Sequence, residues 1–151
     1  MQNKTRTAAA ALVVSAATLV TVATNEEYVG HAYRDAVGVP TIGYGETEGV
    51  KMGDTTTPGR ALIDLKDSLD KHAAGMAACI KVPVFQHEYD AYLDFTYNVG
   101  VTAFCNSTLN KKLNAGDYYG ACKELLRWDR AGGHVLPGLT KRRQQEFQTC
   151  L

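Results

Sequence analysis

The chain has 151 residues, of which 45% are hydrophobic, and its 16 basic and 16 acidic side chains give a formal net charge of zero at pH 7. This length and composition fit one small globular domain with a real core. Without a basic excess, nothing in the overall charge favours nucleic acid as a partner, so attraction to any acidic polymer must be local.

The amino terminus has the pattern of a targeting segment. Lys4 and Arg6 precede residues 7–25, which carry no charge. The 18 residues of 7–24 would form a helix about 27 Å long, just short of a hydrocarbon core of about 30 Å. Hydroxyl residues and alanines dilute its apolar side chains, so we expect a marginal membrane anchor.

Three interpretations compete for this segment: a cleaved signal peptide, a permanent anchor, and a weak anchor that later leaves the bilayer. Cleavage after Ala23 would leave Glu26 beside a frayed new terminus, and the weak composition disfavours permanence. We therefore expect a releasable signal-anchor over residues 1–25 and a catalytic domain over residues 26–151. With the basic residues held inside, the remainder faces the periplasm.

An even number of cysteines in an exported chain favours disulfides. Three pairings are open, and modest loops between sequential helices favour one pair from the first two cysteines and one from the last two. A metal site is not expected, because the chain has no Cys-x2-Cys pair and its histidines are scattered. The four cysteines are Cys79, Cys105, Cys122 and Cys150.

Residues 26–45 read EEYVGHAYRDAVGVPTIGYG and predict a short, glycine-rich β-hairpin. An apolar helical run ends just before Glu26. A hairpin folded back on that helix end would hold Glu26, Asp35 and Thr41 around one cleft. Taken singly, each has an ordinary structural explanation: Glu26 as a polar residue that flanks the apolar run, Asp35 as a turn residue and Thr41 as a strand residue. Together, two carboxylates and a water-positioning hydroxyl suit glycoside hydrolysis, in which one carboxyl donates a proton and the other stays ionised.

The pattern Glu-x8-Asp-x5-Thr, with Ala-Tyr-Arg-Asp and Thr-Ile-Gly-Tyr-Gly around it, resembles the phage-type lysozymes. The resemblance implies that Glu26 is the general acid, Asp35 the second carboxylate and Thr41 the hydroxyl that holds the nucleophilic water. Glu27 stands where the family usually has glycine. It competes for the acid role, but only Glu26 keeps the nine-residue step to Asp35.

The remaining chain is mainly helical in pattern. Residues 46–54 suggest a further short strand and loop, whereas Thr57 and Pro58 begin a long helix that reaches about Ile80. Further helices are expected over residues 86–99, stopped by Gly100, over residues 117–130, ended by two glycines, and over the tail PGLTKRRQQEFQTC. Trp128 is expected in the core rather than stacked on a sugar.

The resemblance also implies a sugar-binding groove, to which several residues are assigned. Ser107 has an equally good explanation as a helix N-cap. Arg142 or Arg143 is expected to pair with the acid or bind an acidic sugar substituent, although a solvated basic helix face fits as well. The expected substrate-binding residues are Tyr44, Glu46, Tyr97, Asn98, Ser107 and Arg142.

The hairpin and the helical patterns predict an α+β, mainly α-helical fold. The resemblance implies that this fold is lysozyme-like, with a long helix that joins a small β-hairpin lobe to a larger helical lobe, although a plain core helix fits the same residues. The resemblance implies an endolysin that needs no cofactor and acts as a monomer. It would cut the β-1,4 bond between N-acetylmuramic acid and N-acetylglucosamine in peptidoglycan for host-cell lysis and phage release. The enzyme would be exported to the host periplasm, tethered at first to the inner membrane.

Two rival functions remain. A lytic transglycosylase would use one acid and form an anhydro-sugar, which Asp35 with Thr41 argues against. A degenerate, membrane-anchored wall-binding protein would not cut at all. Thr41 as a water-holder predicts a hydrolase that inverts the anomeric configuration.

Overall fold

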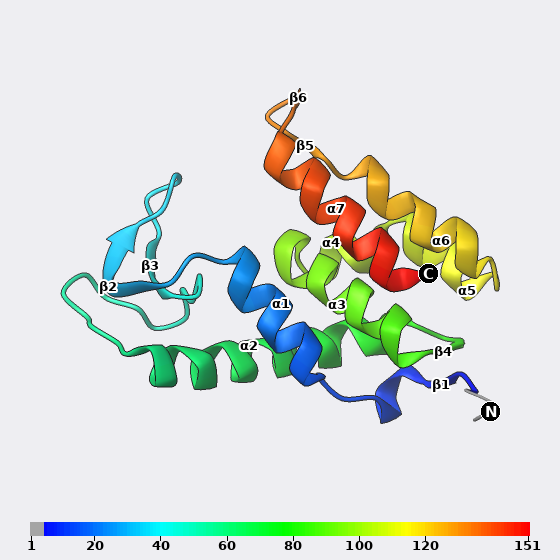
Figure 1. The fold of residues 1–151 in the computed structure, drawn as a ribbon, viewed down its shortest axis with the longest axis horizontal. Helices are drawn as coiled ribbons and strands as arrows, with labels where there is room; N and C mark the ends of the chain where they lie inside the picture. Colours follow the sequence, from blue (N-terminus) through cyan, green and yellow to red (C-terminus); the bar gives the residue numbers. More distant parts are fainter. Residues whose placement is uncertain (1–4) are drawn as a thin grey trace.

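The computed structural model describes residues 5–151. Figure 1 shows a small lobe with a β-hairpin and a larger helical lobe, with one long helix running beneath both. The elements are β1 (Thr7–Ala8), the 3-10 helix η1 (Ala9–Ala11), α1 (Ala16–Asn25), β2 (Val29–Arg34), β3 (Pro40–Gly43), α2 (Pro58–Cys79), β4 (Pro83–Val84), α3 (Gln86–Val99), α4 (Val101–Asn106), α5 (Thr108–Asn114), α6 (Tyr118–Glu124), the 3-10 helix η2 (Leu125–Arg127), β5 (Arg130–Ala131), β6 (His134–Val135) and α7 (Pro137–Cys150).

The long helix α2 has the start that the sequence predicts. The Thr57 hydroxyl accepts the backbone N–H of Arg60, and Pro58 occupies the first turn, where its missing N–H costs nothing. One stripe of α2 is buried because its apolar residues recur at helical spacing. This stripe packs on β3 in the small lobe and on α3 and α4 in the large one. The predicted two-lobed, mainly helical fold is confirmed. The buried residues of the stripe are Ala61, Leu65, Leu69, Ala73 and Met76.

The core of the large lobe is built around α3, which spans the predicted residues and contacts α1, α2, α4 and α7. Tyr92, Leu93 and Phe95 have no exposed surface. Trp128 packs edge-on against Phe95, with ring centroids 5.2 Å apart, so it is a core residue as predicted.

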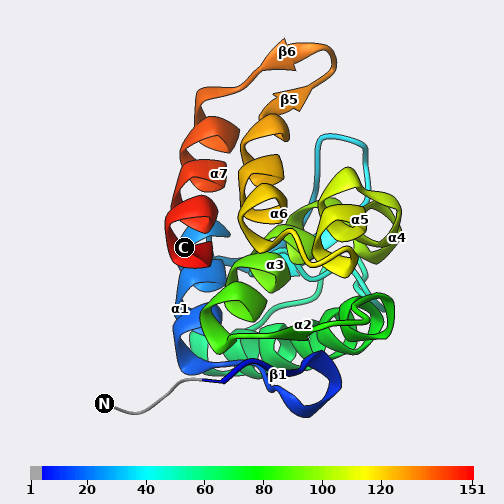
Figure 2. The ribbon, with the colours of Figure 1, turned by 90° about the vertical axis from the view of Figure 1, so that its right-hand side faces the viewer.

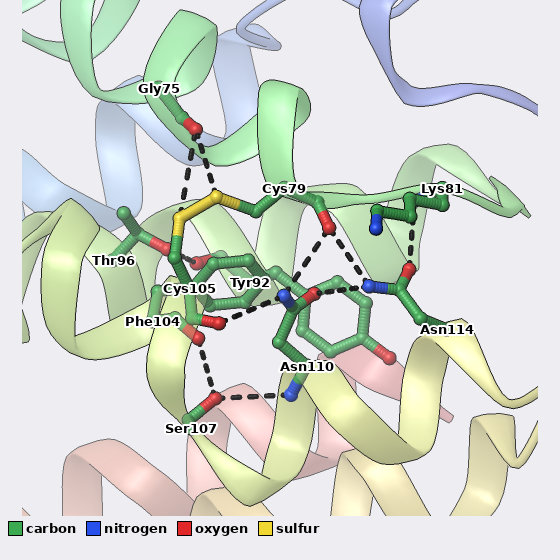
Figure 3. The surroundings of a disulfide bond; sticks show 10 residues. All are labelled: Gly75, Cys79, Lys81, Tyr92, Thr96, Phe104, Cys105, Ser107, Asn110 and Asn114. Atoms are coloured by element: carbon green, nitrogen blue, oxygen red, sulfur yellow. Dashed lines mark hydrogen bonds between the residues drawn. A yellow bond between two sulfur atoms is a disulfide. The ribbon is translucent and has the colours of Figure 1, made fainter.

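Two disulfides join helices of the large lobe. Cys79 at the end of α2 is linked to Cys105 in α4, and Cys122 in α6 is linked to Cys150 in α7. This is the pairing that loop length favoured. Around the first bridge, the Asn110 amide donates to the backbone carbonyls of Cys79 and Cys105, which ties the two helix ends together (Figure 3).

The amino-terminal segment differs from expectation. Residues 7–24 do not form one continuous helix: β1 pairs antiparallel with β4, a 3-10 turn follows, and α1 begins only after Ser15, whose hydroxyl accepts the backbone N–H of Thr18. Val22 is fully buried against the large lobe. Figure 2 shows this segment crossing the base of the helical lobe. Between residues 5 and 151, no helix is long and apolar enough to cross a membrane.

Two further predictions need correction. Residues 46–54 form a loop rather than a strand, with only an isolated bridge between Ile42 and Glu46 at its start. The helix expected over residues 117–130 gives way to a 3-10 turn at Leu125, and β5 and β6 form a hairpin. Gly132 and Gly133 both adopt positive φ in its turn, so the glycine pair makes a hairpin instead of a helix end.

Candidate active site

Glu26 lies where α1 ends and the chain leaves for the hairpin. Its backbone N–H donates to the carbonyl of Val22 and closes the helix. Its side chain is 27% exposed, and Oε1 accepts a hydrogen bond from Nη1 of Arg142 in α7 over 3.0 Å. The acid proposed from the sequence is thus held by a residue 116 positions later in the chain.

Arg142 is shared between carboxylates from three helices. Its Nη2 donates to Oδ1 of Asp94 in α3 over 2.8 Å, and its Nε lies 3.6 Å from Oε1 of Glu146. Burial opposes the charge of Arg142, but Asp94 and Glu26 outweigh it and raise the pKa of the guanidinium. Of the two contacts expected for Arg142, the structure shows the pairing with Glu26.

A second arginine completes this buried cluster. Nη2 of Arg143 donates to Oε1 of Glu146 over 2.7 Å, and the guanidinium lies 4.9 Å from the ring centroid of Phe95. Glu146 is 1% exposed, and burial, followed by the nearby charge of Asp94, raises the pKa of Glu146 to about 9. Burial in this cluster therefore favours the neutral form of Glu146.

An open pocket of about 300 Å³ lies beside Glu26, between the hairpin lobe and the large lobe. Gly45 lies opposite the free oxygen of Glu26: it has φ +83°, and a Cβ there would come within 3.4 Å of Oε2. Because Gly45 has no side chain, the space beside Oε2 stays free, and both residues line the pocket. The lining residues are Glu26, Gly45, Glu46, Thr47, Ser68, His72, Tyr97 and Asn98.

Of the expected substrate-binding residues, Glu46, Tyr97 and Asn98 line this pocket together with Glu26. The hydroxyl of Tyr97 donates to the carbonyl of Tyr44, which connects the helical lobe to the hairpin lobe. Burial and the nearby carboxylates raise the pKa of Tyr97, so its hydroxyl stays neutral and able to donate.

The sequence interpretation missed Ser68 and His72, which also line the pocket. They are four residues apart in α2, and Nδ1 of His72 lies 2.7 Å from the carbonyl oxygen of Ser68. Their spacing places them on one face of the helix, along the edge of the buried apolar stripe. A polar pair at the edge of this stripe, on the helix that joins the lobes, was the available signal.

Asp35 and Thr41 belong to the hairpin. One oxygen of Asp35 accepts the backbone N–H groups of Val37 and Val39, over 3.0 and 2.9 Å. Thr41 is 4% exposed, pairs with Tyr33 across the strands, and its hydroxyl donates to the carbonyl of Val39. Neither side chain lines the pocket beside Glu26. Their local geometry is that of a fixed turn carboxylate and a buried strand hydroxyl.

Ser107 is a structural residue in this fold, so its assignment to the sugar groove needs correction. It is 5% exposed, and its hydroxyl accepts the N–H of Asn110 while donating to the carbonyl of Phe104 (Figure 3). Both capacities of the hydroxyl are used to begin α5. The N-cap alternative explains it completely.

Comparison with known proteins bears on this site. The phage lysozyme family model matches residues 23–146. The chain belongs to the phage lysozyme family. It is 43% identical over 119 residues to an endolysin of Acyrthosiphon pisum secondary endosymbiont phage 1, covering 76% of this chain and 82% of the other. It is 40% identical over 120 residues to a SAR-endolysin of Bacteriophage PS119, covering 79% and 72%.

A solved structure gives the same relationship. The endolysin from Escherichia coli O157:H7 phage FAHEc1 superposes with a TM-score of 0.84 at 34% identity, and the match covers 93% of this chain and 94% of the other. Family, relatives and fold together make this lysozyme-family chain a glycoside hydrolase of the endolysin type.

Proposed function

We propose that this phage lysozyme cuts the β-1,4 bond between N-acetylmuramic acid and N-acetylglucosamine in peptidoglycan. Glu26 is its general acid, Asp35 its second carboxylate and Thr41 its water-holding hydroxyl. One observation carries the assignment of the acid: Glu26 is tied to Arg142 through Oε1, while its other oxygen lies beside Gly45, and both residues line a pocket between the two lobes.

The two oxygens of Glu26 then have separate tasks. Oε1 fixes the orientation of the carboxyl group through Arg142, and Oε2 carries the proton into the pocket. That proton passes to the glycosidic oxygen of the departing sugar. A water supplies the oxygen that bonds to the anomeric carbon, and Asp35 accepts the proton that the water loses. The half-free carboxylate of Asp35 suits this task, because backbone donors hold only one of its oxygens.

Residues from both lobes would hold the sugar. Glu46 from the hairpin lobe and Asn98 from the end of α3 both line the pocket. Tyr44 packs its ring against Tyr28, with centroids 5.5 Å apart, and receives the hydroxyl of Tyr97. We assign the sugar contacts to Glu46, Tyr97 and Asn98, with Tyr44 shaping the wall between them.

Thr41 as the residue that holds the water favours inversion of the anomeric configuration. An inverting enzyme places its carboxyl groups roughly 6.5 to 9.5 Å apart, whereas a retaining enzyme needs about 5 Å and forms a covalent glycosyl-enzyme. A glycosyl group trapped on Asp35 in mass spectra of the quenched enzyme would contradict inversion.

Product analysis from purified peptidoglycan tests the activity itself. A muramidase releases muropeptides with an intact, reducible N-acetylmuramic acid end. A lytic transglycosylase leaves a 1,6-anhydro product that is lighter by one water and resists borohydride. Wall binding without release of any saccharide would leave a binding protein only.

We also propose that the enzyme reaches the periplasm as a membrane-tethered precursor and becomes active on release. The likeness to SAR-endolysins supports this route, and so does the position of α1. Val22 is buried in the large lobe and Glu26 ends the same helix. While residues 7–24 lie in the bilayer, α1 cannot pack here, and Glu26 is kept from its place beside Arg142.

Exposed positions of α1 allow anchoring to be changed without disturbing the core. Ala16 and Thr21 are both exposed. Thr21→Leu should strengthen anchoring and delay lysis, whereas Ala16→Lys should weaken anchoring and advance it. Membrane fractionation and the timing of lysis measure the effect. The mass of the recovered chain must show that its amino terminus has not been cleaved. A soluble, active product that begins at Thr24 would mean ordinary signal cleavage.

A further inference from the structure

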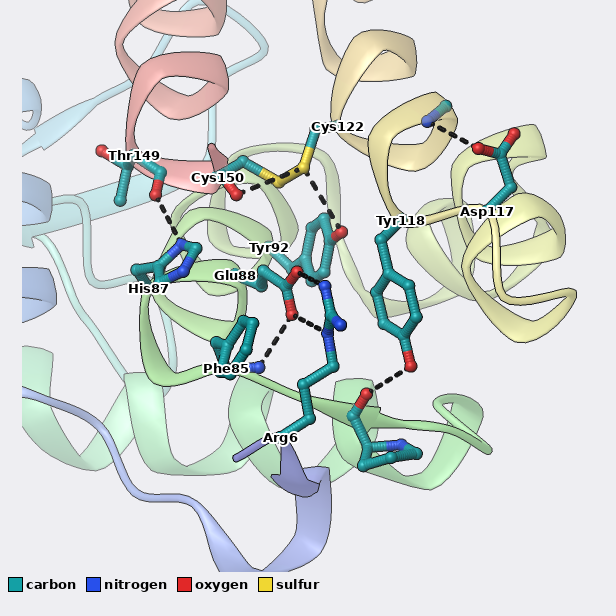
Figure 4. Close-up of polar contacts among 12 residues, drawn as sticks. Arg6, Phe85, His87, Glu88, Tyr92, Asp117, Tyr118, Cys122, Thr149 and Cys150 are labelled. Carbon is teal, nitrogen blue, oxygen red and sulfur yellow. Dashed lines mark hydrogen bonds and ion pairs between the residues drawn. A yellow bond between two sulfur atoms is a disulfide. The ribbon is translucent and has the colours of Figure 1, made fainter. Parts of the chain in front are cut away.

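Arg6, just before β1, makes two hydrogen bonds to the side chain of Glu88 (Figure 4). Its Nη2 donates to Oε1 of Glu88 over 2.8 Å, and its Nε donates to Oε2 over 3.2 Å. Two parallel bonds of this kind are the geometry that distinguishes a guanidinium from an ammonium. Glu88 is 3% exposed and lies in the first turn of α3.

Two aromatic rings complete the surroundings of this guanidinium. Cζ of Arg6 lies 3.6 Å from the ring centroid of Tyr118 and 4.4 Å from that of Phe85. The Tyr118 hydroxyl donates to the carbonyl of Pro83, which fixes the ring in place. Cation–π attraction therefore adds to the charge-assisted hydrogen bonds. The contact with Glu88 raises the pKa of Arg6.

Glu88 needs this partner. Its Oε2 also accepts the backbone N–H of Phe85 at the start of α3, but that bond supplies no positive charge. A carboxylate taken out of water without a cation is strongly unfavourable. Backbone pairing of Thr7 with Val84 and burial of Ala9 bring the segment to the same place.

We propose that Glu88, Phe85 and Tyr118 form a guanidinium-binding site, and that its occupation by Arg6 latches the amino-terminal segment to the helical lobe and favours the released enzyme over the tethered one. The second part rests on the proposed tethered delivery. In the tethered form Arg6 precedes the membrane segment, so the bilayer separates it from Glu88 and the site lacks its ligand. Only release fills the site, so its binding free energy shifts the equilibrium toward release.

A double-mutant cycle on the purified full-length enzyme tests the site. Glu88→Gln keeps a side-chain oxygen that can accept the N–H of Phe85 but removes the charge. We expect Arg6→Gln and Glu88→Gln each to raise the unfolding equilibrium constant about 10- to 100-fold. The unfolding equilibrium constant of the double variant should be no higher than that of the less stable single variant. Arg6→Lys, which keeps the charge but loses the paired bonds, should fall between wild type and Arg6→Gln. Additive effects of the two Gln substitutions would overturn the site.

Fractionation of cells that express full-length chain tests the latch. Arg6→Lys keeps the positive charge before the membrane segment, and Glu88→Gln leaves that segment untouched. Both should raise the membrane-bound fraction several-fold and delay lysis. The matched control is Glu124→Gln, which removes a buried carboxylate that pairs with Lys112 and Arg127 on α5 and η2.

The control separates latching from general stability. Glu124→Gln should weaken the fold in both the tethered and the released enzyme and leave the partition unchanged. A shift as large as that of Glu88→Gln would overturn the latch. If wild-type chain is never found in membranes, the delivery route and the latch's part in release both fail, while the cycle on purified enzyme still decides whether Arg6 and Glu88 are coupled.

Discussion

The two lobes hold their proposed catalytic carboxylates in different ways. In the hairpin lobe, Asp35 is fixed by two N–H groups of its own turn, within four residues. In the helical lobe, Glu26 is fixed by Arg142, which Asp94 in turn holds from a third helix. The first arrangement forms wherever the hairpin forms. The second exists only when α1, α3 and α7 have packed together.

Because of this difference, substitutions in the two lobes should affect activity and stability differently. Changes at the hairpin should remove catalysis and leave unfolding nearly untouched, because few tertiary contacts are lost. Changes in the buried cluster should affect both, because the same hydrogen bonds orient the acid and neutralise charges that water cannot reach.

Asp35→Asn should give the largest separation. The amide oxygen still accepts the N–H groups of Val37 and Val39, so the turn is kept, but the negative charge is lost. We expect hydrolysis of purified peptidoglycan to fall by about 10²- to 10³-fold, since an amide does not replace a carboxylate facing developing positive charge. Urea unfolding should change by less than about 0.5 kcal/mol. A large loss of stability would mean that Asp35 is needed for the folding of the hairpin lobe rather than for catalysis.

Asp94→Asn should reduce activity less than Asp35→Asn does, but it should also reduce stability. The amide can still accept one bond from Arg142, but the guanidinium loses a buried counter-charge. We expect activity to fall about 10-fold or more and unfolding free energy to fall by about 2 kcal/mol. Asp90→Asn, one turn earlier in α3, is the matched control. Equal effects at the two positions would show that Arg142 does not depend on Asp94.

Glu146→Gln should have the smallest effect on activity, while its effect on stability depends on pH. The folded-state pKa of about 9 lies above that of an unfolded glutamate, so the unfolded chain loses this proton first. The stability that Glu146 contributes is therefore complete below about pH 4.3 and declines as pH rises toward 9. Glutamine cannot ionise, so the variant lacks this decline. Urea unfolding at pH 5, 7 and 8.5 should show the free energy of unfolding of the variant gaining on that of wild type as the pH rises. Parallel pH curves would mean that Glu146 is ionised in the fold.

Local sequence signals predicted the frame of the molecule well. Thr57 and Pro58 mark the start of α2, Gly100 ends α3, and these signals act within one helical turn. The hairpin followed from turn residues for the same reason. The glycine pair at Gly132 was misjudged, since glycines serve helix ends and hairpin turns alike.

Contacts between distant segments were beyond such signals. Nothing near Asp94 or Glu146 in the sequence shows that α3 and α7 bring them to one guanidinium. The pairing of β1 with β4 was hidden for a similar reason, because an apolar run of this length fits a bilayer and a folded core equally well. Arg6 was assigned only a flanking charge, whereas its partner Glu88 lies 82 positions away.

The most direct test of the central claim compares two adjacent carboxylates. Glu26 lines the pocket and is held by Arg142, whereas Glu27 is exposed. Glu26→Gln keeps size and polarity but removes the proton that must be transferred, so peptidoglycan hydrolysis should fall by about 10³-fold or more while the fold is retained. Glu27→Gln should lower the rate less than about threefold. Substantial hydrolysis by Glu26→Gln, or a greater loss from Glu27→Gln, would contradict Glu26 as the acid.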